Sequence, residues 1–133
     1  MNIQVRWLDN NHRIILHKFE PDWDWDDFIE ASRLSGEMMD TVDHPVDVIA
    51  DGRGIELPDQ ALSIMPKIRE HSATLNHPRG GRYVIVGINR LIRTFVDVYM
   101  AAFSQHKEKI FFVDEYDEVY KLLGFSPGNV IEE

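Results

Sequence analysis

Hydrophobic positions along the chain change their spacing from one segment to the next. Residues 3–8 alternate apolar and polar side chains, and residues 13–19 form a second apolar run, with Asp-Asn-Asn-His at 9–12 between them. Alternation is typical of a half-buried strand, and Asn and Asp are typical turn residues. These two segments therefore predict an antiparallel β-hairpin.

Beyond the hairpin, helix and strand patterns take turns. After Pro21, Asp24 is expected to cap a helix with Asp27 as its N3 partner, and apolar side chains follow at helical spacing as far as Val42. The pattern then predicts strand 46–50, helix 59–75, strand 83–88, helix 91–105, strand 109–113 and helix 114–123. We expect Pro66 to kink or break the helix over 59–75. Such alternation predicts right-handed crossovers and a parallel section of sheet.

Length and composition indicate one domain. The chain has 133 residues and no cysteine, which is long enough to bury a core without disulfides. We expect a domain over residues 1–125 and a loose tail over 126–133. The absence of cysteine fits the reducing cytoplasm, where we expect the protein. The first residues lack an apolar secretory core and no apolar run is long enough to span a bilayer, so we expect neither export nor a transmembrane segment.

The charge balance narrows the class of partner. There are 23 acidic and 14 basic residues, which give a formal net charge of −9. Such a surface repels phosphate backbones, so we do not expect nucleic acid to be a partner.

One acidic segment looks like the start of a calcium-binding loop. Asp22, Asp24 and Asp26 have the spacing of its first ligands. The sixth position of such a loop needs glycine and the twelfth a bidentate glutamate, whereas this chain has Asp27 and Arg33 there. Helix capping is therefore the better interpretation of this segment.

Other motifs for cofactors and catalysis are incomplete or absent. Gly52 and Gly54 would need a third glycine at position 57, which is leucine, to form a dinucleotide fingerprint. The six histidines lack zinc-site spacing, and no serine has a nucleophile-elbow setting. We therefore expect no metal site, no cofactor and no enzymatic activity.

Polar residues follow the ends of the predicted parallel strands, where α/β proteins usually bind ligands. The candidate binding residues there are Asp51, Arg53, Asn89 and Arg90, with Arg93 one turn into the next helix. Arg90 and Arg93 place positive charge at a helix start, which opposes the helix dipole and favours an anionic partner. The alternative is that both arginines are solvated and that Arg93 pairs with Asp97 four residues on.

The helix over 91–105 is apolar over an arc of roughly 200°, which is wider than one sheet face covers. Val96, Met100 and Phe103 lie on the part of this arc that the sheet would not cover. We predict that they contact another molecule, either a second copy of the chain or an apolar ligand. The alternative is that a neighbouring helix covers them.

Three segments resemble the SpoIIAA-like branch of the STAS superfamily, the anti-sigma-factor antagonists. They are residues 46–62, VDVIADGRGIELPDQAL, residues 84–87, VIVG, and residues 110–114, IFFVD, before an acidic last helix. The resemblance implies an α/β fold, a single STAS-like domain with a mixed five-stranded sheet and about four helices. Some relatives resemble the lipid-binding CRAL-TRIO fold, which adds an apolar ligand or peripheral membrane contact to the functions that the resemblance implies.

The chain departs from the family at its phosphorylation site. The antagonists have Asp-Ser-Ser-Gly at the start of the second helix, where this chain has Asp59, Gln60, Ala61 and Leu62. In one register Gln60 takes the place of the phosphorylated serine, and in the other Asp59 does. Asp59 is expected to cap the helix rather than act chemically.

These observations together predict a non-enzymatic STAS-like module that binds a protein partner or forms a homodimer. The alternative is a carrier or sensor of a small apolar or amphipathic, lipid-like ligand.

Overall fold

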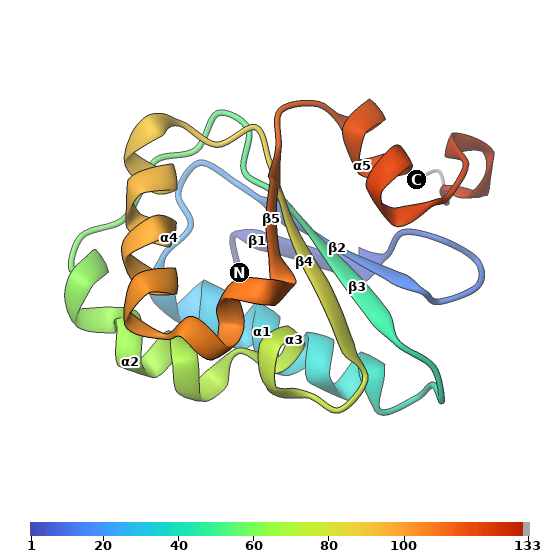
Figure 1. The fold of residues 1–133 in the computed structure, drawn as a ribbon, viewed down its shortest axis with the longest axis horizontal. Coiled ribbons are helices and arrows are strands. Elements are labelled where there is room, and N and C mark those ends of the chain that lie inside the picture. Colours follow the sequence, from blue (N-terminus) through green and yellow to red (C-terminus); the bar gives the residue numbers. More distant parts are fainter. Residues whose placement is uncertain (132–133) are drawn as a thin grey trace.

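The computed structural model describes residues 1–131, which form a five-stranded mixed sheet with helices packed against it (Figure 1). The strands are β1 (Ile3–Trp7), β2 (Ile14–Phe19), β3 (Val46–Asp51), β4 (Gly80–Val86) and β5 (Ile110–Val113). The α-helices are α1 (Trp25–Met39), α2 (Ala61–His71), α3 (Ala73–Asn76), α4 (Arg90–Ala102) and α5 (Tyr116–Leu123). Two short 3-10 helices are η1 (Ser104–Lys109) and η2 (Pro127–Asn129). The predicted α/β class and mixed sheet are confirmed.

The strands lie in the sheet in the same order as in the chain. β1 pairs antiparallel with β2, and every later pair is parallel. Since right-handed crossovers that all step in one direction place their helices on one face, α1 to α4 share a face of the sheet. Figure 1 shows α5 apart from these helices. In the core, Val119 of α5 packs with Ile49 and Val84, whereas Met39 of α1 packs with Val48 on the other face.

β3 lies in the middle of the sheet and is buried on both faces, which explains its nearly continuous apolar sequence. Val46, Val48 and Ala50 pack on the face that α1 covers, and Ile49 packs on the α5 face. Because side chains alternate along a strand, Asp51 also points to the α5 face. A buried strand thus ends in a carboxylate beside α5.

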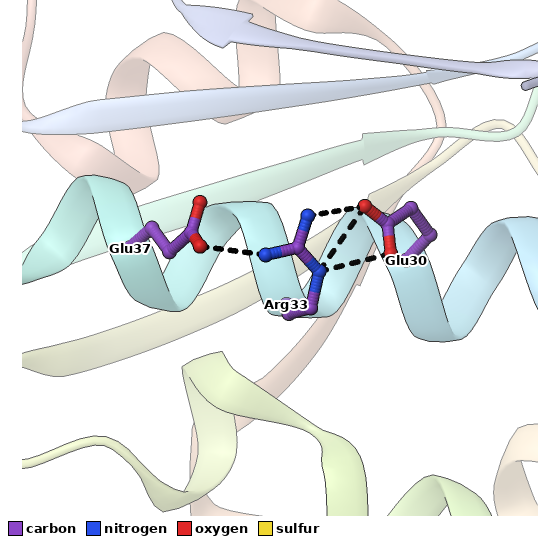
Figure 2. Close-up of polar contacts among 3 residues, drawn as sticks. All are labelled: Glu30, Arg33 and Glu37. Atoms are coloured by element: carbon purple, nitrogen blue, oxygen red, sulfur yellow. Dashed lines mark hydrogen bonds and ion pairs between the residues drawn. The ribbon is translucent and has the colours of Figure 1, made fainter.

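α1 begins with the capping box that the sequence predicts. The Asp24 carboxylate accepts a hydrogen bond from the Asp27 amide (2.8 Å), and the Asp24 amide donates to the Asp27 carboxylate (3.2 Å). Farther along α1, Arg33 donates to Glu30 and to Glu37 in a row that Figure 2 shows. All three side chains are about half exposed, so solvent screens the pairs and they add little to stability.

The predicted helix over 59–75 is divided, but not at Pro66. Pro66 stays inside α2, and the chain leaves the helix at Ser72 before α3 begins. The missing proline N–H would have bonded the Leu62 carbonyl, which lies in the exposed first turn where water can reach it. The separate α3 then packs against β4 and α1.

The prediction that Asp59 caps α2 is wrong. Gln60 occupies the cap position in the left-handed conformation, with φ of 66°, and its side chain makes no capping hydrogen bond. Asp59 lies one residue earlier and is exposed. With the cap position at Gln60, Asp59 is not the residue at which α2 begins.

Two further segments differ from their predictions. β4 spans Gly80–Val86 rather than the predicted 83–88, and at Gly80 a Cβ atom would collide with the Thr74 carbonyl oxygen. The tail is not loose as far as residue 131. Val130 forms a β-bridge with Asp9, and the Ile131 amide donates to the Leu8 carbonyl (2.7 Å). Residues 132 and 133 lie outside the described part of the chain.

Candidate functional site

The loop between β3 and α2, residues 52–60, lies over the end of the sheet and is held by three side chains from other parts of the chain. The Trp23 indole donates to the carbonyl of Glu56 (3.0 Å), the Trp25 indole to that of Asp59 (2.8 Å), and the Asn89 amide to that of Ile55 (3.2 Å). The loop is therefore tied both to the segment before α1 and to the start of α4.

Next to this loop is an apolar cavity of about 90 Å³ between the sheet, α2 and α4. The sheet contributes Ala50, Tyr83, Ile85 and Ile110, and α4 contributes Ile92, Phe95, Val96 and Tyr99. None of the described residues that line the cavity carries a formal charge. Its surface therefore suits an apolar group.

Aromatic rings form one wall of the cavity. The ring centroids of Trp23 and Trp25 are 5.0 Å apart and nearly perpendicular, and Trp25 lies 5.5 Å from Phe95 of α4. Phe19 of β2 continues the series, 4.8 Å from Trp23. Edge-to-face packing of this kind fixes the rings in position. This wall joins α1, β2 and α4 across the cavity.

The three residues predicted as a contact surface on α4 lie in different surroundings. Val96 lines the cavity, and Phe103 packs against the core with its ring 5.1 Å from that of Tyr99. Met100 is half-buried. The large apolar side chains of α4 that are exposed are Leu91 (64%) and Val98 (44%).

On the opposite face of the sheet, Asp51 and Arg53 form the best-defined ion pair of the predicted site. The Arg53 guanidinium donates to both carboxylate oxygens of Asp51 (3.0 and 2.9 Å), and the Tyr116 hydroxyl donates to one of them (3.0 Å). Burial acts to raise the pKa of Asp51, but the hydrogen bonds from Arg53 and Tyr116 outweigh it and hold that pKa below its ordinary value. Burial and the Asp51 charge both raise the pKa of Tyr116.

Beside this ion pair is a second, polar cleft of about 300 Å³. It is lined by strand side chains of β1, β2 and β3 and by Tyr116 and Tyr120 of α5. Asp51 and Arg53 therefore face away from the apolar cavity. The structure separates the predicted site into two places, one on each face of the sheet.

The remaining predicted residues lie around the loop and the start of α4. Asn89 caps α4 by accepting a hydrogen bond from the Ile92 amide (2.9 Å). Arg93 pairs with Asp97 (3.4 Å), as one of the two alternatives expected, and its guanidinium lies 3.7 Å from the ring centroid of Phe112. Arg90, Asp59 and Gln60 are exposed.

Sequence reasoning missed the aromatic wall and the α5 contribution. The acidic residues around Trp23 and Trp25 were interpreted only as a helix cap. Two tryptophans at the start of a helix also indicate a buried aromatic cluster. Tyr116 reaches Asp51 across 65 positions of the sequence, and no spacing rule connects such residues.

A buried polar chain beside α4 was also missed. The Tyr99 hydroxyl lies 2.8 Å from Nδ1 of His106, and Nε2 of His106 lies 3.1 Å from the Asn76 side-chain oxygen. Since an amide oxygen only accepts, Nε2 carries the proton and Nδ1 accepts from Tyr99. These two hydrogen bonds connect η1 to α4 and to the end of α3.

The sequence was compared with protein-family models and with curated proteins. It matches no protein-family model, and no curated protein matches it.

Within residues 1–131, no three histidine, aspartate or glutamate side chains come together in a group that could hold a metal ion. The helices in this part of the chain are too short or too polar to cross a membrane.

Proposed function

We propose that this domain is a non-enzymatic binding module that takes a small apolar ligand, or the apolar end of a larger one, into the cavity between the sheet and α4. The observation that carries the proposal is the cavity itself, with its uncharged and largely aromatic lining. Such cavities stay dry and accept apolar guests, because water would find few hydrogen-bond partners inside.

The energy of packing supports the same conclusion. Protein interiors are close-packed, and cavity formation costs roughly 24 cal/mol per Å³. An apolar group bound in this volume of about 90 Å³ would make packing contacts that the unfilled space lacks. An engineered cavity of about 150 Å³ binds benzene. This smaller cavity suits a group of a few carbon atoms, such as the end of an alkyl chain.

The loop over residues 52–60 gives the ligand site a connection to the surface. Its bonds to Trp23 and Trp25 link the cavity wall to the loop whose sequence resembles the STAS signature region. We propose that the module is STAS-like, which the order of its strands and helices supports. We also propose that it acts in the cytoplasm. In this hypothesis, ligand binding is read out by a partner at the surface.

A second candidate function is binding of a protein partner or of a second copy. Leu62 (69% exposed), Leu91 (64%) and Val98 (44%) are the large apolar side chains of α2 and α4 that face solvent. Residues of α2 and α4 contact each other, so the two helices lie side by side. Exposed apolar side chains on adjacent helices favour an interaction surface.

Filling the cavity tests the ligand hypothesis. Ala50 lines the cavity from β3, and Ala50→Val adds two methyl groups there. Ala101→Val makes the same change at an exposed position of α4 and serves as the control. Each purified protein is extracted with organic solvent, and the extract is analysed by mass spectrometry.

We expect an apolar compound to accompany the wild type and Ala101→Val and to be lost from Ala50→Val. The tryptophan fluorescence of wild type should change when the extract is returned to the stripped protein, because Trp23 and Trp25 line the cavity. An empty wild-type extract together with unchanged fluorescence would reject the ligand hypothesis.

A further inference from the structure

The polar cleft on the α5 face has the properties of a second binding site. Its charged lining residues are Arg6, Lys18, Asp51 and Arg53, and its aromatic ones are Tyr116 and Tyr120. The volume of about 300 Å³ is at the lower end of the range for small-molecule sites. This cleft and the apolar cavity are lined by different residues.

The charges in the cleft are arranged for an anion. Asp51 is only 5% exposed, and its carboxylate is occupied by Arg53 and Tyr116, so it presents little negative charge to a ligand. The Lys18 side chain is exposed, and its ammonium group makes no hydrogen bond or ion pair within residues 1–131. Positive charge is thus available in a chain whose net charge is −9.

Arg53 is already held in a binding orientation. Nε and Nη2 donate to Asp51, and the guanidinium lies 4.9 Å from the ring centroid of Tyr116. Within the described part of the chain, Nη1 has no hydrogen bond to a protein group. A fixed guanidinium with a free N–H group binds an oxyanion with little loss of side-chain entropy.

Other groups support or limit the site. Arg6 donates to the carbonyls of Trp7 and Ile131 (both 3.3 Å), which holds its guanidinium at the wall of the cleft. Glu20 accepts a hydrogen bond from the Gln4 amide (2.7 Å), and the charge of Glu115 acts on Arg53. Neither glutamate lines the cleft.

We propose that this cleft binds a small organic oxyanion, with its carboxylate or phosphate group between Lys18 and Arg53. The rings of Tyr116 and Tyr120, which are 6.2 Å apart, provide a surface for the apolar part of the ligand. The proposal does not depend on the apolar cavity, since the two sites are on opposite faces of the sheet.

The test is an NMR titration of the full chain with benzoate and with phenyl phosphate, at constant ionic strength kept with sodium chloride. We expect saturable shifts of the amide signals of Lys18, Arg53 and Tyr116. Benzoate and phenyl phosphate share a ring, so the one that binds more tightly identifies the oxyanion class.

Two lysine variants make the result specific. Lys18→Gln should weaken binding about tenfold, equivalent to about 1.4 kcal/mol, because it removes one charged donor. Lys67→Gln removes an exposed lysine of α2, on the other face, and should leave the affinity unchanged. Ala50→Val should also bind the oxyanion as wild type does, whatever happens to the apolar ligand.

Three results would overturn the proposal. The first is that neither compound produces saturable shifts. The second is that the shifts cluster away from the cleft. The third is that both lysine variants weaken binding equally, which would indicate that the anion is attracted to surface charge in general and not to this cleft.

Discussion

His17 is the most deeply buried ionisable side chain of β2, and its ring has one hydrogen-bond partner. Nε2 lies 2.5 Å from the Ser35 hydroxyl, while Nδ1 is buried and has no partner within the described residues. Burial lowers the pKa of His17 from 6.5 to about 4. The imidazole is therefore neutral in the folded protein at neutral pH.

This shift predicts loss of stability in mild acid. Between pH 6.5 and 4 the unfolded state binds a proton at His17 and the folded state does not, so the free energy of unfolding falls as the pH falls. The contribution of His17 to the free energy of unfolding is fully present above about pH 6.5. Between pH 7 and pH 5 we expect the free energy of unfolding to fall by about 2 kcal/mol because of this group. Urea unfolding at the two pH values measures it.

The matching variants are His17→Gln and His71→Gln. Glutamine keeps a polar group near Ser35 but does not titrate, so His17→Gln should remove most of the difference between pH 7 and pH 5. His71 is exposed at the end of α2, so His71→Gln serves as the control variant. An undiminished acid effect in His17→Gln would show that another group causes it, with His106 as the next candidate because burial also lowers its pKa.

A second prediction at this scale compares two aspartates that precede helices. Asp24→Ala should lower the free energy of unfolding by about 1 kcal/mol, because Asp24 accepts a hydrogen bond at the start of α1. Asp59→Ala should change it by less than about 0.5 kcal/mol, because Asp59 is exposed and is not the cap of α2. Equal losses in the two variants, measured by urea unfolding, would contradict this distinction.

At the scale of elements, α4 separates the cavity from solvent. Its inner side carries Val96 and the buried Ile92 and Tyr99, and its outer side carries Leu91 and Val98. A ligand in the cavity would therefore press on the helix whose other side is the candidate partner surface. The two candidate functions can operate through the same element.

The outer side of α4 is tested by replacing Leu91 and Val98 with serine together. Both are exposed, so the double variant should remain folded with a loss of no more than about 1 kcal/mol. Phe103→Ser removes a ring packed against the core and should cost about 3 kcal/mol or more. Denaturant melts compare the variants, and light scattering measures their mass. If wild type is a dimer, loss of the dimer in the double variant alone would identify this surface as the interface.

At the scale of the whole molecule, we expect folding to require no metal ion. Melting curves recorded with and without a chelator should superimpose, because specific metal binding would stabilise the folded state by mass action. A fall in melting temperature of more than a few degrees with the chelator would contradict this expectation.

The order of strands and helices could be predicted from sequence because each one depends on its own periodicity. β3 and α1 are clear examples, since a continuous apolar run and a capping box are local signals. The break at Ser72 and the start of β4 at Gly80 were missed, because they depend on contacts between α3 and β4.

The candidate site was predictable only where it follows the ends of strands. Asp51, Arg53 and Asn89 were found in this way, and all three make defined contacts around the loop or the cleft. The partners of Asp51 and Arg53 on α5, and Lys18 on β2, come from distant parts of the chain. Their proximity follows from how the sheet is assembled and where α5 packs, and periodicity contains no information about that packing.

The matching order of strands in the chain and in the sheet has a consequence for synthesis on the ribosome. Each new strand pairs with the strand made just before it, so the sheet can grow from β1 toward β5 as the chain emerges. The contacts of Val130 with Asp9 and of Ile131 with Leu8 then join the latest described residues to the earliest hairpin. We expect a nascent chain that lacks these residues to hold most of the sheet but to leave Leu8 and the wall of the polar cleft unprotected.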